Sequence, residues 1–271
     1  MRKMCQVFIF TDLDGTLLDS ETFSFNNAKK FINEIVELGI KIIPNSSKTS
    51  KEIDYFCTEA NIDKTFISEN GSEICGLNIL DKSLPKKYIL SRKKEEILKI
   101  FQESVETKVK NKCLILSEQS LEKQKRILGL SSDQVKVALN RNYSIPMIFN
   151  GNYKEKINLI EQIKYLGLSI QFGGRVLNLG DNVDKGISMN ILLDLLKKIN
   201  TNKVITIGIG DNQNDLEMLH LSDYPCLILN QNNILKKNMK KKYITSKKPS
   251  PLSWIDVVKK SLKKIDLDLK V

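Results

Sequence analysis

The sequence predicts an α/β fold in which a parallel sheet, built from both ends of the chain, carries a second unit inserted in the middle. Short apolar runs alternate with amphipathic stretches near both ends, and polar residues directly follow several of these runs. Such alternation is typical of parallel strands joined by helices in right-handed crossovers. The middle of the chain has an alternation of its own, which indicates a separate unit.

The N-terminal part begins this pattern. Val7-Phe8-Ile9-Phe10 is a short apolar run of the kind found in buried strands. Apolar residues at helical spacing follow and end at Gly39, and Thr49 to Glu52 has the pattern of a capping box that begins another helix. We expect, in order, strand 7–11, helix 26–38, strand 40–44, helix 50–60 and strand 65–68.

The C-terminal part resumes the pattern after about residue 181. An apolar helical stretch follows Asp184-Lys185-Gly186, and the run Val204-Ile205-Thr206-Ile207 is typical of another buried strand. We expect helix 186–199, strand 203–209, helix 214–221, strand 225–229 and a final helix near 252–265.

The middle of the chain has helical patterns and short apolar runs. Pro85, followed by two lysines, is typical of a linker, and Ser131 to Gln134 has the pattern of a further capping box. We expect helices 91–107 and 152–166 and strands 112–116, 146–150, 168–172 and 175–179. The expected domains are therefore a core of residues 1–85 and 181–271 and an inserted domain of residues 86–180.

The composition indicates a globular protein with free thiols. The chain has 271 residues, of which 41% are hydrophobic, and this length can bury a sizeable core. No apolar run is long enough for a membrane span, and a cleaved signal peptide would remove the first strand. The five cysteines are scattered without a CxxC pair, which favours reduced thiols over disulfides or zinc. We therefore expect a cytoplasmic protein with no membrane partner.

The net charge of +11 raises the question of a nucleic-acid partner. The densest basic segment runs from Lys236 to Lys248, and its one aromatic residue is Tyr243, whereas platforms for base stacking interleave several aromatics. We expect this segment to be a solvated face and the protein to have no nucleic-acid partner. A basic surface can still steer an anionic substrate toward the protein.

Charged and hydroxyl side chains stand where the expected strands end, at the edge where open α/β sheets bind ligands. Asp12 and Asp14 follow the first strand, and alternation along an extended chain places both on one side. Two carboxylates that close require a divalent cation, a proton held on one of them, or both. The same edge is expected to receive Ser46, Lys185, Asp211 and Asp215.

The sequence contains, in this order, Asp-x-Asp-Gly-Thr, a Ser at a strand end, a Lys at a helix start and Gly-Asp-x-x-x-Asp. This series of motifs resembles the haloacid dehalogenase (HAD) superfamily of phosphohydrolases. Nearly the whole chain is similar to its mannosyl-3-phosphoglycerate phosphatase family, which has a type IIB cap. The closer resemblance rests on Asn45-Ser46-Ser47-Lys48-Thr49, Glu69-Asn70-Gly71, Gly173-Gly174-Arg175 and Asp184-Lys185-Gly186. It implies a Rossmann-like parallel-sheet HAD core with an inserted α+β cap domain.

The resemblance implies the roles of the catalytic residues. Asp12 would attack phosphorus, and Asp14 would protonate the departing alkoxide and then activate water. Lys185 would neutralise the phosphate and keep Asp12 ionised. The phosphate would be bound by Ser46, Ser47 and Gly15. Mg²⁺ is the expected cofactor, held by Asp12, the backbone carbonyl of Asp14, Asp211 and Asp215.

The expected substrate readers are Glu69, Asn70, Arg175 and Lys48. Arginine suits a glycerate carboxylate because its fork matches two oxygens, whereas Lys48 is also compatible with a solvated helix entry. The chain departs from the family at Ile145 and Met147, where the cap motif would carry a glutamate and an aromatic residue after Arg141. We expect these two changes to bear on which sugar the cap accepts.

The resulting hypothesis is hydrolysis of a hexosyl-3-phosphoglycerate to glycosylglycerate and phosphate by a monomer or small homo-oligomer. Three alternatives stay open: another HAD type IIB sugar-phosphate phosphatase or a sugar phosphomutase, a phosphoaspartate receiver module, and a basic nucleic-acid binder. His220, the one histidine, is expected to cap or pack at a helix end, and its being alone argues against phosphatases that use a nucleophilic histidine with histidine partners.

Overall fold

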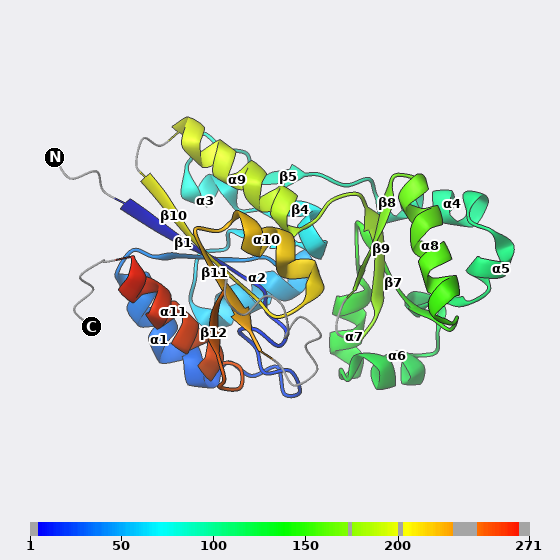
Figure 1. The fold of residues 1–271 in the computed structure, drawn as a ribbon, viewed down its shortest axis with the longest axis horizontal. Coiled ribbons are helices and arrows are strands. Elements are labelled where there is room, and N and C mark those ends of the chain that lie inside the picture. Colours follow the sequence, from blue (N-terminus) through cyan, green and yellow to red (C-terminus); the bar gives the residue numbers. More distant parts are fainter. Residues whose placement is uncertain (1–4, 173–174, 200–202, 230–242, 266–271) are drawn as a thin grey trace.

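The structure, a computed structural model, describes residues 5–172, 175–199, 203–229 and 243–265. Figure 1 shows two lobes joined by two crossing segments: a larger one, called the core, and a smaller one, called the cap. The core contains the elements from both ends of the described chain, and the cap contains the elements from the middle. The expected α/β fold with an inserted second unit is confirmed.

The core is built on a five-stranded sheet in the order β12-β11-β10-β1-β2, in which every pairing is parallel. Its strands are β1 (Cys5–Thr11), β2 (Lys41–Pro44), β10 (Lys203–Gly210), β11 (Tyr224–Ile228) and β12 (Ile244–Ser246). β1 pairs with β10 along its whole length, from Cys5 opposite Lys203 to Thr11 opposite Ile209. The two strands that precede the acidic motifs are therefore neighbours at the centre of the sheet.

Helices cover both faces of this sheet. One face packs against α1 (Asn26–Glu37), α2 (Ser50–Ala60) and α11 (Leu252–Lys264), and the other against α3 (Leu77–Leu80), α9 (Lys185–Ile199) and α10 (Leu216–Leu221). The alternating side chains of β1 divide between the two, with Val7 and Ile9 on the first face and Phe8 and Phe10 on the second. This burial on both faces explains why the strand sequences read as continuous apolar runs.

A small second sheet extends the core toward the cap. It consists of β3 (Phe66–Ser68), β4 (Glu73–Cys75) and β5 (Lys87–Ile89), in that order and all antiparallel. β4, β5 and α3 were not predicted, because three- and four-residue elements leave no periodic signal to detect. Residues 87–89 pair with the core, and the elements of the cap begin at Lys94.

The cap is a four-stranded antiparallel sheet in the order β6-β7-β9-β8 with helices around it. Its strands are β6 (Cys113–Ile115), β7 (Ser144–Phe149), β8 (Leu168–Phe172) and β9 (Leu177–Asp181). Its helices are α4 (Lys94–Ser104), α5 (Thr107–Lys110), α6 (Leu121–Leu128), α7 (Ser132–Leu139) and α8 (Tyr153–Tyr165). The expected helix 91–107 corresponds to α4, which is shorter at both ends, and α5 and α6 were missed. The capping boxes at Thr49 and Ser131 are confirmed. Gly173 and Gly174, part of the family resemblance, lie outside the described residues.

The cap sheet has one apolar face and one polar face. Ile145, Met147 and Leu179 point into the hydrophobic core of the cap, together with α4 and α8. The intervening residues, among them Ser144, Gln171 and Asn178, occupy the opposite face. Asn178 is only 4% exposed although it lies outside the hydrophobic core of the cap, because the larger lobe covers this polar face.

One ion pair joins the two segments that cross between the lobes. Arg92, between β5 and α4, donates from Nε and Nη2 to the two carboxylate oxygens of Asp181 at the end of β9, over 2.9 and 2.6 Å. The Arg92 backbone amide also donates to Asp181, over 2.9 Å. The chain therefore leaves the core and returns to it at adjacent points.

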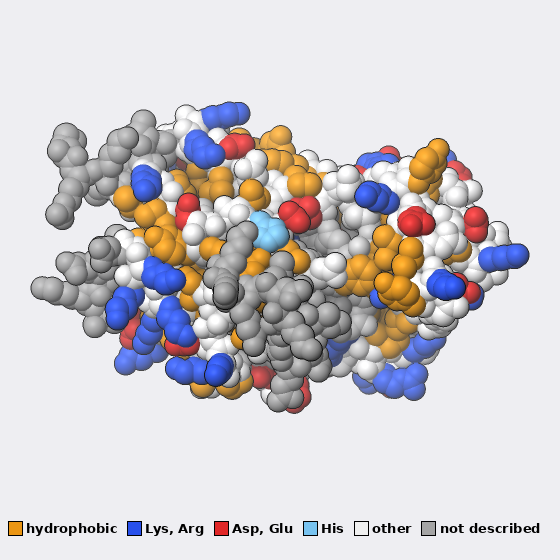
Figure 2. Space-filling view, viewed as in Figure 1, with side chains coloured by type: hydrophobic (Ala, Val, Ile, Leu, Met, Phe, Trp, Pro, Cys, Tyr) orange, Lys and Arg blue, Asp and Glu red, His pale blue; other side chains and the backbone are white. Residues whose placement is uncertain are grey.

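The surface charge is dispersed on the face that Figure 2 presents, where Lys and Arg side chains are scattered over both lobes. Most of the basic segment 236–248 lies outside the described residues, so the expected solvated face stays a prediction. Within residues 5–265, the helices that the structure describes include none with both the length and the apolar character to cross a bilayer.

Candidate active site

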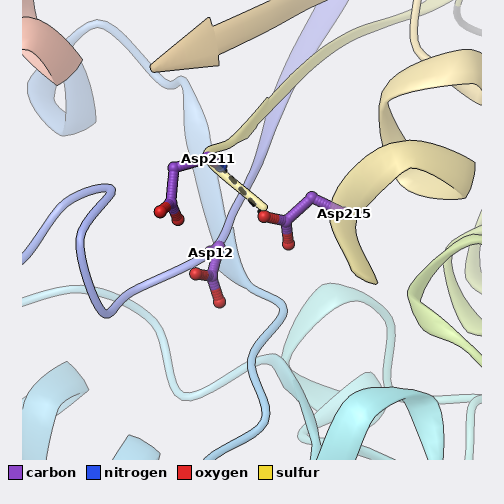
Figure 3. A group of neighbouring side chains, drawn as sticks. All are labelled: Asp12, Asp211 and Asp215. Carbon is purple, nitrogen blue, oxygen red and sulfur yellow. Dashed lines mark hydrogen bonds between the residues drawn. The ribbon is translucent and has the colours of Figure 1, made fainter. Parts of the chain in front are cut away.

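Three carboxylates converge at the carboxyl edge of the central sheet (Figure 3). Asp12 follows β1, Asp211 follows β10, and Asp215 ends a short 3₁₀ turn, Gln213–Asp215. Each offers an oxygen that lies within 4.8 Å of the oxygens of the other two. Asp215 comes this close because residue 210 is glycine, since a Cβ there would stand 2.4 Å from the Cβ of Asp215. The sequence order that suggested one site is therefore matched by one cluster in space.

Lys185 lies beneath this cluster and is fully buried at the start of α9. Its Nζ donates to Asp12 Oδ1 and to Asp215 Oδ1, both over 2.6 Å. Burial alone would lower the pKa of Lys185, but the two carboxylates outweigh burial and raise it. The lysine is therefore a permanent positive charge that holds the Asp12 side chain in position.

The carboxylates remain crowded despite this cation. Burial, partly offset by Lys185 and reinforced by Asp215 and Asp14, raises the pKa of Asp12 from 3.8 to about 7. Burial and the charges of Asp215 and Asp12 likewise raise the pKa of Asp211 well above its ordinary value. Without another cation, this site therefore favours holding a proton at neutral pH.

The donor set fits a hard divalent cation such as Mg²⁺, which prefers a few carboxylate oxygens together with phosphate and water. Asp211 is further oriented by Thr16, whose hydroxyl donates to Asp211 Oδ1 over 2.7 Å. Asp215 Oδ2 accepts from the backbone amides of Asp211 and Asn212, both over 2.9 Å, so the loop itself holds this carboxylate in place. Thr16 was not among the expected site residues, although it stands within the Asp-x-Asp-Gly-Thr motif.

The loop after Asp12 presents free backbone amides. Among the described residues, neither the Leu13 nor the Asp14 amide donates to a protein acceptor. Gly15 was expected to bind phosphate, but its amide donates to the Leu18 carbonyl over 3.0 Å, and its φ of 77° serves the turn. The geometry therefore offers Leu13 and Asp14, rather than Gly15, as the amide donors of an oxyanion cradle.

Ser46 is fully buried at the end of β2, and the Lys48 amide donates to its Oγ over 3.3 Å. The Ser47 amide has no acceptor within the described part of the chain. Both expected phosphate ligands of this loop therefore have polar groups left to donate.

Asp14 lies beside the buried cluster with its side chain 40% exposed, and its Oδ1 is 2.9 Å from Lys48 Nζ. Lys48 also approaches Glu52 Oε1 to 3.7 Å, and these charges outweigh burial and raise its pKa. Lys48, expected to read substrate, is in this structure the ionic partner of the expected acid–base residue.

Two expected substrate readers have their side chains bound to protein. The Glu69 carboxylate accepts from the Asn142 and Tyr143 amides, over 2.9 and 3.1 Å, and from the Ser144 hydroxyl, over 2.6 Å. Asn70 accepts from Asn214 over 3.1 Å. The structure therefore places Glu69 as a contact between core and cap, with no carboxylate oxygen directed at open space.

Arg175 is exposed at the tip of the β8–β9 connection. Its guanidinium donates to the Leu128 carbonyl in the cap and, over 3.3 Å, to the Ser20 carbonyl in the core, and it lies 5.3 Å from the Phe23 ring centroid. Lys48 Nζ is also 5.3 Å from that ring. Arg175 therefore reaches the loop that follows Asp14, but it lies outside the buried cluster.

The two departures in the cap motif do not face a substrate. Ile145 and Met147 are 5% and 0% exposed within the cap's hydrophobic core. The expectation that Ile145 and Met147 bear on the choice of sugar is therefore wrong for this geometry. On the same strand, Ser144 is the side chain that points out of the cap toward the larger lobe, where it donates to Glu69.

A small polar cavity of about 10 Å³, room for about one water molecule, lies between the lobes. Gln171 and Asn178, opposite each other on β8 and β9, line it, and each has a buried amide oxygen without a hydrogen-bond partner among the described residues. Sequence patterns missed both, because an isolated amide in a short strand carries no motif.

Comparison with known proteins agrees with this geometry. A family of haloacid dehalogenase-like hydrolases matches residues 9–250. The chain therefore belongs to the haloacid dehalogenase-like hydrolase family. It is a phosphatase, as the resemblance implied.

Named relatives make the similarity more specific. A glucosyl-3-phosphoglycerate/mannosyl-3-phosphoglycerate phosphatase of Persephonella marina is 31% identical over 267 residues, covering 95% of this chain and 98% of that protein. A mannosyl-3-phosphoglycerate phosphatase of Pyrococcus horikoshii is 29% identical over 222 residues, covering 79% and 87%. The solved structure of a HAD subclass IIB sugar phosphatase shares the fold, with a TM-score of 0.62 at 18% identity over 95% of this chain and 98% of that one.

Proposed function

We propose that the protein is a Mg²⁺-dependent phosphatase that hydrolyses a hexosyl-3-phosphoglycerate, mannosyl or glucosyl, to glycosylglycerate and phosphate. The observation that carries the chemistry is the buried cluster of Asp12, Asp211 and Asp215 around Lys185, with Asp14 two residues from Asp12. The substrate class rests on the names of relatives about 30% identical along most of the chain.

In the first step, an oxygen of Asp12 forms a bond to phosphorus while the bond from phosphorus to the glycerate oxygen breaks. Asp14 gives its proton to that leaving oxygen, which departs as the alcohol. The contact with Lys185 supports Asp12 in this role, because the ammonium group holds the carboxylate in one orientation.

In the second step, a water oxygen forms a bond to phosphorus and the bond from phosphorus to Asp12 breaks. Asp14, now a carboxylate, takes the proton from water, which returns both side chains to their initial state. Ser46, Ser47 and the amides of Leu13 and Asp14 would hold the phosphate oxygens during both steps.

Asp12, Asp211, Asp215 and the Asp14 carbonyl would hold the Mg²⁺. When bound, the ion would supply positive charge that neutralises the phosphate oxygens. The raised pKa values of Asp12 and Asp211 support such a site, since a cation relieves the repulsion that raises them.

The test is release of inorganic phosphate from a panel containing mannosyl- and glucosyl-3-phosphoglycerate, 3-phosphoglycerate and simple phosphosugars, with Mg²⁺ or with EDTA. We expect the highest kcat/KM on a hexosyl-3-phosphoglycerate and loss of activity in EDTA. A preference for a phosphosugar would identify another sugar phosphatase. Turnover that required a bisphosphate activator, without net phosphate release, would identify a phosphomutase. The proposed partners are limited to such a small substrate, with the protein as a monomer or small homo-oligomer.

A further inference from the structure

The loop of residues 46–48, called here the phosphate loop, has all three of its carbonyl oxygens held by hydrogen bonds. The Asn70 amide donates to the Ser46 carbonyl, and the Glu69 amide donates to the Lys48 carbonyl, both over 2.9 Å. The third donor comes from the cap: Arg141 Nη1 donates to the Ser47 carbonyl over 2.9 Å. The cap therefore completes the support of a loop that otherwise belongs to the core.

Arg141 is linked to the Ser46 hydroxyl indirectly, through the peptide group between Ser47 and Lys48. The Ser47 carbonyl and the Lys48 N–H belong to the same planar group and point in opposite directions. Because Arg141 holds the carbonyl, it also fixes the Lys48 N–H, which donates to Ser46 Oγ over 3.3 Å. The Ser46 Oγ thus accepts a hydrogen bond from the Lys48 amide, and its own hydroxyl proton is left to donate to a phosphate oxygen.

Arg141 is itself held rigidly. It is 8% exposed, its Nε donates to the Ala138 carbonyl over 2.9 Å, and its Nη1 donates to Ser144 Oγ over 3.0 Å. Ser144 in turn donates to Glu69 over 2.6 Å. A lysine has one donor group and no planar fork, so it cannot reproduce these three directions.

The core side of this contact adopts a costly backbone conformation. Glu69 and Asn70 have positive φ values of 45° and 59°, which side-chain-bearing residues seldom adopt. Such conformations persist only where surrounding contacts offset their cost. Here the Glu69 carboxylate receives three donors from residues 142–144 of the cap, which supplies that offset.

We propose that Arg141 is a positioning residue that couples the seated cap to phosphate binding, so that the phosphate loop takes its binding form only when Arg141 is docked on Ser47. The inference rests on the proposed phosphate-binding role of Ser46. Under this proposal Arg141, a cap residue, acts in phosphate binding, which all phosphate ester substrates share, and not in the choice of sugar.

The test compares Arg141→Ala with Arg92→Ala, a matched control that removes another arginine joining cap and core, one that does not contact the phosphate loop. The readouts are kcat and KM for p-nitrophenyl phosphate with Mg²⁺, and Ki for inorganic phosphate and orthovanadate. We expect Arg141→Ala to raise KM and both Ki values on the order of tenfold, the effect of losing one charged hydrogen bond, with kcat retained. Arg92→Ala should leave the Ki values unchanged.

Hydrogen exchange of the Lys48 amide provides a readout that does not depend on activity. Arg141→Ala should speed this exchange relative to wild type and to Arg92→Ala, and Arg141→Lys serves if the alanine variant does not fold. An inactive wild type with faster Lys48 exchange in Arg141→Ala would overturn the proposed function and still support the coupling. Ki values and Lys48 exchange in the Arg141 variants that match those of Arg92→Ala would overturn the coupling.

Discussion

The catalytic cluster and the seam between the lobes are both buried and polar, yet they are built differently. The cluster consists of charges placed at the ends of adjacent parallel strands, around one buried lysine. The part of the seam that lies next to the phosphate loop and the small cavity consists of neutral amides, backbone groups and two long charged side chains, Glu69 and Arg141. The difference teaches that the proposed chemistry is placed by the ends of one sheet and the helix beside it, whereas the contacts between the lobes depend on side chains far apart in the sequence.

The largest effect is expected at Asp12, the proposed nucleophile of the catalytic cluster. Asp12→Asn should lower kcat by a factor on the order of 10⁴ or more on every substrate, because an amide is a far weaker nucleophile than a carboxylate. Phosphate release by purified protein with Mg²⁺ is the measurement, and circular dichroism controls for the fold. More than trace activity would remove Asp12 from this role.

The second-largest effect separates proton transfer from metal binding within the cluster. Asp14→Asn should lower kcat by roughly 10²- to 10⁴-fold and spare Mg²⁺ affinity, since the expected ligand there is the backbone carbonyl. Asp211→Asn should weaken Mg²⁺ binding itself. Isothermal titration measures both affinities, and the ligand assignment fails if Mg²⁺ binding collapses in Asp14→Asn but not in Asp211→Asn.

Substrate reading by the cap should give a smaller and selective effect. Arg175→Ala should lower kcat/KM on a hexosyl-3-phosphoglycerate about tenfold, because an exposed arginine that binds a carboxylate contributes less than a buried one. Hydrolysis of p-nitrophenyl phosphate should hardly change. Arg126→Ala on α6 is the matched control, and equal losses on both substrates would assign Arg175 to the fold or the catalytic geometry.

The smallest effect is the contribution of the cluster to the pH dependence of stability. Since folding raises the pKa of Asp12 from 3.8 to about 7, the folded metal-free protein binds more protons than the unfolded chain between these values. The free energy of unfolding of the metal-free protein should therefore fall as pH rises through this window.

Mg²⁺ should reverse that loss, because it replaces the proton as the positive charge. Its addition should raise Tm by about 2–4 °C more at pH 8 than at pH 5.5. Differential scanning calorimetry measures the shift, with NaCl at matched ionic strength as the control. An equal or larger shift at pH 5.5 would contradict the assignment of the raised pKa to the metal cluster.

The sequence predicted that these carboxylates lie together, because each pair stands within a few residues at the end of one strand. Asp12 and Asp14 stand at one strand end, Asp211 and Asp215 four residues apart at another, and strand alternation with helices brings these ends together. The seam has no such local code. Glu69 meets Asn142 across 73 positions, and Arg141 meets Ser47 across 94, so only the folded structure pairs them. Ile145 and Met147 were misread because a motif letter does not say which face of a strand it occupies.

The ion pair between Arg92 and Asp181 has a consequence for how the cap can be exchanged. Because these residues lie within hydrogen-bond distance, the whole intervening segment leaves and re-enters the core at nearly one point. Insertions whose ends meet in this way leave the host domain's strand order unbroken. No strand of the five-stranded sheet lies between residues 92 and 181 in the part of the chain that the structure describes. We therefore expect that a short turn joining these two residues would preserve every pairing in this sheet, and that a domain of another shape would be accepted at the same junction.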